Sequence, residues 1–82
     1  MALVHKIDYG SEGWNTIYYT DDTKYKGYTK DGEIREGLGT LYAENGSLLK
    51  RGIWQDNELI ESLEEEEYNL RVNLSIQRTP HW

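Results

Sequence analysis

The sequence predicts a mainly β fold, a twisted antiparallel sheet of consecutive β-hairpins with one short C-terminal helix and a final strand. Two stretches resemble each other, "GWNTIYYTDDTKYKG" from residue 13 and "GLGTLYAENGSLLKRG" from residue 37, and they align at an offset of 24 residues. In both, short β-prone runs flank a polar turn. A fixed period in the twenties is typical of stacked repeat units. At 82 residues, we expect a single domain over 1–82.

The composition favours a thin sheet over a thick core. The chain has seven Tyr and three Trp but no Phe, and only 37% of its residues are hydrophobic. Tyr and Trp can bury a ring while the polar tip stays in water. A domain of this size also buries a modest share of its surface.

The expected strands cover about 14–20, 23–29, 38–43 and 48–55, and together they form the repeat region 13–56. Asn45-Gly46 is the strongest turn signal, because both residues tolerate positive φ. Asp21-Asp22 is a weaker turn of the same kind, and Asp31-Gly32 turns the chain between the two hairpins. Two repeats need caps at their ends, so we expect residues 1–12 to add an N-terminal cap strand.

Two glycines interrupt the third expected strand. Alternation places Gly37, Gly39 and Leu41 on one face and the intervening residues on the other. A glycine inside a strand marks a place where another backbone or ring comes close. We expect an aromatic ring from the adjacent hairpin there; the alternative is simple loop flexibility.

The last third of the chain is expected to close the sheet over 57–79. Asn57 is a candidate N-cap, and Leu59, Ile60 and Leu63 fall at helical spacing, which predicts a helix over about 57–67. Strict alternation of apolar and polar residues then predicts a strand over 68–77.

Residues 13–56 resemble about two degenerate MORN repeats, and the motif is clearest over residues 25–54. The MORN pattern is Tyr-x-Gly, an aromatic residue, a polar turn ending in Gly, and then Gly-x-Gly with a short strand. The motif residues that match are Tyr25, Gly27, Tyr28, Asp31, Gly32, Gly37, Gly39, Asn45, Gly46, Gly52 and Trp54. Lys50 stands where the following repeat has its Tyr, and Asn15 replaces the second Gly of the first repeat. The resemblance implies consecutive hairpins that serve as a binding or scaffold surface, and phospholipid binding is often proposed for such repeats.

The charge is acidic and uneven, which bears on the class of partner. The net charge is −6. Residues 1–54 hold seven Lys/Arg and eight Asp/Glu, whereas residues 55–82 hold two Lys/Arg and seven Asp/Glu. Nucleic acid and anionic lipid both repel such a chain. We therefore expect a protein partner with a basic surface, and neither direct nucleic acid binding nor membrane binding.

Two features of the sequence bear on the location of the protein. The first ten residues lack the apolar run of a signal peptide, and no run of 18 apolar residues is present. These features predict a cytoplasmic protein, in the host cytoplasm if it is phage-encoded.

The run Glu64, Glu65, Glu66 and Glu67 has two interpretations. It is either the solvated face of a helix end or an acidic patch that binds Lys and Arg of a partner. Acidic residues at successive helix positions spread over more than one face, which favours partial solvation.

Residues that would carry chemistry are sparse. The chain has no Cys, and its two His residues, His5 and His81, lie near the two ends. No spaced ligand set for a structural zinc site is present, and Gly37-Leu38-Gly39 lacks the helix and Lys of a phosphate-binding loop. We expect no catalytic residues, no metal and no cofactor, and hence no enzyme.

The aromatic residues are the remaining candidates for function. Tyr18 and Tyr19 must point to opposite faces of a strand, so some aromatic surface stays exposed or is covered by the C-terminal segment. Exposed Tyr and Trp rings are common interface anchors. The candidate partner-binding residues are Trp14, Tyr19, Tyr28 and Trp54, together with the acidic run.

The sequence thus favours a small non-enzymatic protein-binding module, an acidic inhibitor or adaptor that docks on a basic partner. The link to inhibitors of nucleic-acid-handling enzymes, including phage-encoded inhibitors, is an analogy with other compact acidic proteins. The alternative is a structural module that assembles with itself, as a homodimer through the strand 68–77.

Overall fold

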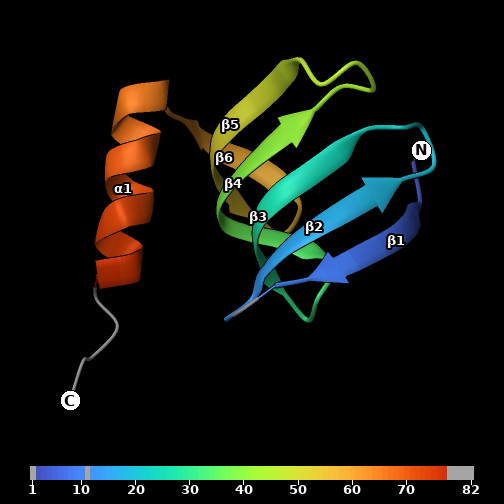
Figure 1. Cartoon of the computed structure of the whole chain (residues 1–82), viewed down its shortest axis with the longest axis horizontal. Helices are drawn as coiled ribbons and strands as arrows, with labels where there is room; N and C mark the ends of the chain where they lie inside the picture. The colour runs from blue at the N-terminus through green and yellow to red at the C-terminus, as the bar shows by residue number, and fades with distance from the viewer. Residues whose placement is uncertain (1, 11, 78–82) are drawn as a thin grey trace.

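The computed structural model describes residues 2–10 and 12–77, which form one six-stranded antiparallel sheet and one helix (Figure 1). The elements are β1 (Val4–Tyr9), β2 (Trp14–Tyr19), β3 (Lys24–Lys30), β4 (Ile34–Tyr42), β5 (Leu48–Gln55), β6 (Glu58–Ser62) and α1 (Glu65–Gln77). The strands lie in the order β1-β2-β3-β4-β5-β6, so every strand pairs with its neighbours in sequence and the sheet does not close on itself. The predicted fold class, mainly β with consecutive hairpins and one short C-terminal helix, is confirmed.

The two repeats fold into turns with the same hydrogen bonds. In the first turn, Oδ1 of Asp21 accepts from the backbone N and the hydroxyl of Thr23. In the second turn, Oδ1 of Asn45 accepts from the same two groups of Ser47. The offset of 24 residues predicted from the sequence therefore pairs residues that have the same structural role.

Alternation along the strands divides the side chains between an inner and an outer face. The inner face holds the buried core, which consists of Ile17, Tyr19, Tyr25, Leu41 and Trp54. Partly buried Ala2, Ile7 and Leu59 pack against this core. The core therefore draws on strands from β1 to β6 and depends on a curved sheet.

A row of glycines crosses the inner face and makes room for a ring. Gly27 pairs with Gly39, and Gly39 pairs with Gly52, so the three lie side by side on β3, β4 and β5. The hydroxyl of Tyr25 occupies the space that a Cβ on Gly39 would fill. The prediction that an aromatic ring from the adjacent hairpin lies over these glycines is confirmed for Gly39.

The helix predicted over 57–67 is wrong, because this segment starts with a hairpin turn and continues as β6. Asp56 and Asn57 have φ of 48° and 72°, which is the conformation of the two central residues of a tight hairpin turn. Asn57 does not cap a helix; its Oδ1 accepts from the backbone N of Arg35 at 2.9 Å. The neighbouring strand, which pairs Trp54 with Leu59, overrides the helical spacing of the apolar residues.

The strand predicted over 68–77 is also wrong, because these residues lie in α1. Strict alternation also places apolar residues four positions apart, which is a helical repeat. On α1 this separates buried Tyr68 and half-buried Val72 from exposed Leu70 and Leu74. Three acidic residues in the first turn favour a helix that starts at residue 65 through the helix dipole.

Helix α1 stands beside the β4–β6 end of the sheet and contacts β4 and β5 (Figure 1). The segment between β6 and α1 is held to β5 by two hydrogen bonds between Leu63 and Arg51. The backbone N of Leu63 donates to the carbonyl of Arg51 at 3.0 Å, and Nε of Arg51 donates to the carbonyl of Leu63 at 3.2 Å. No helix within the described residues is long and apolar enough to cross a membrane.

Candidate functional site

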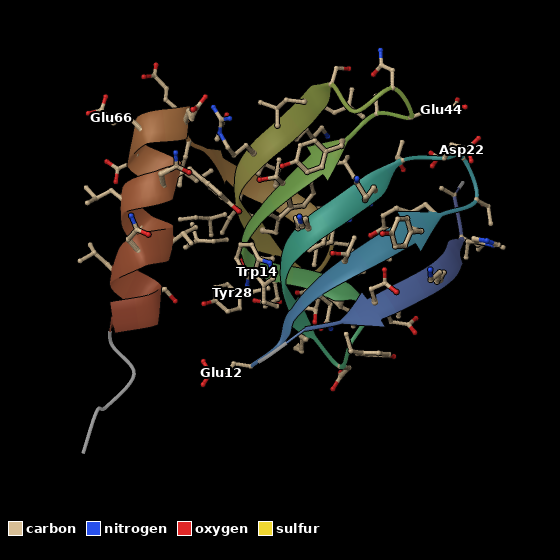
Figure 2. The ribbon with its side chains drawn as sticks, in the orientation of Figure 1. Glu12, Trp14, Asp22, Tyr28, Glu44 and Glu66 are labelled. Carbon is tan, nitrogen blue, oxygen red and sulfur yellow. The ribbon has the colours of Figure 1, made fainter. Side chains whose placement is uncertain are left out.

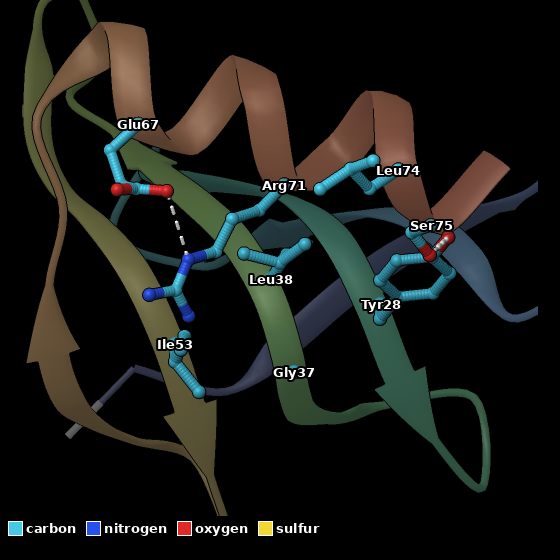
Figure 3. A pocket seen from close by; sticks show the side chains of 8 residues that line it. All are labelled: Tyr28, Gly37, Leu38, Ile53, Glu67, Arg71, Leu74 and Ser75. Carbon is cyan, nitrogen blue, oxygen red and sulfur yellow. Dashed lines mark hydrogen bonds and ion pairs between the residues drawn. The ribbon is translucent and has the colours of Figure 1, made fainter. Parts of the chain in front are cut away.

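The cavity between α1 and the outer face of the sheet has a volume of about 510 Å³. Its lining comprises Tyr28, Gly37, Leu38, Ile53, Glu67, Arg71, Leu74 and Ser75 (Figure 3). Two of the predicted partner-binding residues, Tyr28 and Glu67, lie in this lining. A cavity of this size falls in the range of ordinary ligand and peptide sites.

An ion pair closes one end of the cavity and a hydroxyl pair the other. Nε of Arg71 lies 3.1 Å from Oε2 of Glu67, one helical turn earlier. The same guanidinium reaches Oε2 of Glu61 at 3.9 Å. At the other end, the hydroxyls of Tyr28 and Ser75 are 2.8 Å apart (Figure 3). The walls between these two ends are apolar.

Trp14 and Tyr28 form an aromatic pair on the outer face. Their ring centroids are 5.0 Å apart at an interplanar angle of 87°, which is a favourable edge-to-face arrangement. Trp14 pairs with Tyr28 across β2 and β3, and both are half-buried. Figure 2 shows the two residues close together beside α1. They are the two predicted aromatic candidates that lie together on the outer face.

Tyr19 and Trp54 are buried in the core, so the expectation that they are exposed is wrong. Only 2% of Trp54 and 8% of Tyr19 is accessible to solvent. The indole Nε1 of Trp54 donates to the carbonyl of Gly39 at 3.0 Å, and its ring meets the Tyr25 ring edge-on at 5.5 Å. Alternation in β2 and β5 turns both side chains to the inner face.

The acidic run straddles the start of α1 and is exposed throughout. Glu64 precedes the helix, and Glu65, Glu66 and Glu67 form its first turn. Figure 2 shows Glu66 on the side of α1 away from the sheet. Glu67 is paired with Arg71, whereas the other three make no ion pair with any described residue. The run thus stabilises the helix N-terminus and leaves carboxylates in solvent.

Tyr68 anchors α1 to the outer face. It is buried, and burial raises the pKa of its phenol above the ordinary value. Its hydroxyl makes no hydrogen bond to any described residue. Tyr68 was not predicted as an anchor, because the predicted strand placed it in a row of alternating residues. Its position after four acidic residues, which favour a helix start, was the signal available in the sequence.

Residues suited to catalysis or metal binding do not gather in the described part of the chain. No group of three or more His, Asp or Glu residues there is arranged to hold a metal ion. His5 is exposed on β1, and His81 lies outside the described residues. Ser75 lies near a phenol and an ion pair, a set that lacks a base for nucleophilic attack.

No family model, no curated protein and no solved structure matches the chain in comparisons with known proteins.

Proposed function

We propose that the chain is a non-enzymatic protein-binding module that docks on a basic partner through the acidic segment from β6 to the first turn of α1. One observation carries this proposal. The segment 58–67 holds six exposed glutamates, and Arg71 is the one described cation within ion-pair distance of any of them. Such a surface attracts Lys and Arg of a partner and speeds the encounter.

The outer face supplies the apolar part of the docking surface. Glu67 and Ser75 are eight residues apart on α1, which corresponds to about 12 Å along the helix axis. The acidic segment and the Trp14–Tyr28 pair therefore lie at opposite ends of the same helix-covered face. Charged groups at an interface steer and orient the partner, while aromatic groups contribute more of the binding energy.

The resemblance to MORN repeats remains part of this proposal. The matched hydrogen bonds of the turns at Asp21 and Asn45 and the glycine row under Tyr25 support it. We also propose a role as an inhibitor or adaptor in the cytoplasm, phage-encoded or not, by analogy with other compact acidic proteins.

The experiment compares two variants with the same change of charge. The patch variant carries Glu64→Gln, Glu65→Gln and Glu66→Gln, and keeps Glu67 because it holds Arg71. The control variant carries Glu12→Gln, Asp22→Asn and Glu44→Gln, three exposed acids at turns of the sheet (Figure 2). Affinity capture from source cells identifies the partner by mass spectrometry, and titration calorimetry measures its binding.

We expect the patch variant to lose at least about tenfold in affinity and to show a weaker dependence on salt, while the control variant binds like the wild type. Equal weakening of both variants would mean that only the net charge matters. Unchanged binding of the patch variant across salt concentrations would exclude the acidic segment as the docking surface.

Self-assembly remains a second candidate, because the sheet has two unpaired edges. β1 and β6 are the first and last strands of an open sheet, and Leu3, Val4 and Tyr9 on or beside β1 are exposed. Open edges can pair with another chain. The proposed homodimer through strand 68–77 is not possible by strand pairing, because that segment is helical. Light scattering at micromolar concentration distinguishes a monomer from an edge-paired oligomer.

A further inference from the structure

Arg35 extends from β4 onto the inner face and lies among three aromatic rings. Its guanidinium carbon is 4.7 Å from the ring centroid of Tyr19, 4.9 Å from that of Trp54 and 5.7 Å from that of Tyr25. Cation–π attraction of this kind is stronger when the cation is partly desolvated, and Arg35 is half-buried.

The backbone and one side-chain nitrogen of Arg35 are held in place. Its backbone N donates to Oδ1 of Asn57 at 2.9 Å, and its carbonyl accepts from the backbone N of Asn57 at 3.1 Å. Its Nε donates to the hydroxyl of Tyr19 at 2.8 Å. The guanidinium is therefore oriented before any ligand arrives, which lowers the entropic cost of binding.

The two terminal nitrogens of this guanidinium have no anionic partner among the residues that the structure describes. Arg35 forms no ion pair with a carboxylate of the described residues, and its one side-chain hydrogen bond there uses Nε. In a chain with a net charge of −6, a half-buried arginine without a carboxylate is unusual. Buried charges are ordinarily paired.

A cavity of about 670 Å³ has Arg35 in its lining. Arg35 and Tyr19 line it, and so do Ala2, Leu3, Val4 and Ile34, which give it apolar walls. Asn57 and the exposed carboxylate of Glu33 complete the lining. The lining of the cavity thus combines an arginine whose guanidinium is held in place with aliphatic residues and one acidic residue.

We propose that this cavity is a binding site for an aliphatic carboxylate, either a free acid or the C-terminal residue of a peptide with an aliphatic side chain. The terminal nitrogens of Arg35 would hold the carboxylate by two parallel hydrogen bonds, the arrangement for which a guanidinium is suited. The aliphatic body would contact Leu3, Val4 and Ile34. The site is separate from the acidic docking segment, so the two proposals can fail independently.

The chemical test uses two carboxylates and their matched amides on the wild-type protein. The probes are 4-methylpentanoate and N-acetyl-leucine, each compared with its primary amide, and binding is followed by NMR. The reporter signals are the side-chain Nε–H of Arg35 and the indole Nε1–H of Trp54. We expect both signals to shift with the carboxylates, and the amides to bind at least about tenfold more weakly.

The two carboxylates also distinguish the source of the ligand. Tighter binding of N-acetyl-leucine indicates a peptide terminus, and tighter binding of 4-methylpentanoate indicates a free acid. Equal binding of the acids and their amides would overturn the proposal. So would the absence of a shift with either acid at about 10 mM, because a specific site of this size has a smaller dissociation constant.

Two variants test the roles of the charged residues. Arg35→Lys keeps the charge but loses the planar fork, so we expect the acids to bind at least about tenfold more weakly. Glu33→Gln removes an exposed carboxylate that repels the ligand, so we expect the acids to bind about two- to fivefold more tightly. If Arg35→Lys does not fold, the Glu33→Gln variant and the comparison of acids with amides still test whether the carboxylate binds in this cavity. Unchanged affinity in Glu33→Gln together with equal binding of the amides would reject the site.

Discussion

The Tyr25 side chain lies over Gly39 of the neighbouring strand, with its hydroxyl in the space that a Cβ on Gly39 would fill. From there the hydroxyl donates to the carbonyl of Tyr28 at 2.7 Å. The ring is fully buried and meets Trp54 edge-on. The glycine row and this one tyrosine thus form a single packing unit at the centre of the inner face.

We expect Gly39→Ala to destabilise the protein by about 3 kcal/mol, at the upper end of the usual cost of overpacking. The added methyl collides with the Tyr25 side chain, which is fully buried and already in edge-to-face contact with Trp54, so the ring has little room to move. Chemical denaturation monitored by Trp fluorescence measures the change. Gly46→Ala is the control for backbone strain without a clash, since Gly46 has a φ of 87° and nothing lies within 4 Å of its Cβ position; a milder effect at Gly39 than at Gly46 would contradict the packing argument.

Stability should fall above about pH 10, the ordinary pKa of tyrosine. Burial raises the pKa of Tyr25 above that value, so in this range the unfolded chain releases the proton more readily than the folded chain. The folded state then binds more protons, and the free energy of unfolding decreases as pH rises, by at most about 1.4 kcal/mol per pH unit for this group.

Urea denaturation between about pH 9 and about pH 12 measures this slope. Tyr25→Phe should flatten it and cost about 1 kcal/mol at neutral pH through the lost hydrogen bond. Tyr9→Phe is the matched control, because Tyr9 is an exposed ring on β1. A slope that survives in Tyr25→Phe would assign the effect to another group, and Tyr68, whose pKa burial also raises, is the first to examine.

Substitutions in the two repeat turns are expected to change the stability of the protein in opposite directions. Asp22 has φ of 69°, and Gly46, its equivalent 24 residues later, has φ of 87°. Left-handed backbone costs a non-glycine residue roughly 1 kcal/mol. We expect Asp22→Gly to stabilise the protein by about 0.5–1 kcal/mol and Gly46→Asp to destabilise it by a similar amount. Thermal unfolding of both variants checks this, and a change of the same sign in both would disprove the equivalence of the turns.

The same turns should differ at acidic pH. Hydrogen bonds from Thr23 hold the pKa of Asp21 below its usual range, so the carboxylate form favours the turn, and this contribution is lost as pH falls through that lowered pKa. Asn45 makes the equivalent bonds to Ser47 with an amide and does not titrate. Amide NMR signals of Thr23 should therefore shift on acidification while those of Ser47 stay, and Asp21→Asn should remove the difference.

The strand order could be predicted because its signals are local. Gly46 and both residues of Asp31-Gly32 take the positive φ that marks their turns. The strands β2, β3 and β5 lie within one residue of their predicted bounds at each end. The C-terminal third could not be predicted in the same way. Alternating apolar residues over 68–77 fit a strand and a two-sided helix equally well, and Asp56-Asn57 is a turn without glycine.

The sequence by itself determined the repeat, its turns, the hairpin order and the acidic C-terminal segment, because each depends on residues close together in the chain. Only the tertiary structure decided which aromatic rings are buried, where α1 packs and which rings surround Arg35. Those outcomes depend on the curvature of the sheet, which brings Tyr19, Arg35 and Trp54 together from three different strands. Curvature arises from packing across the whole inner face, and no single stretch of the chain encodes it.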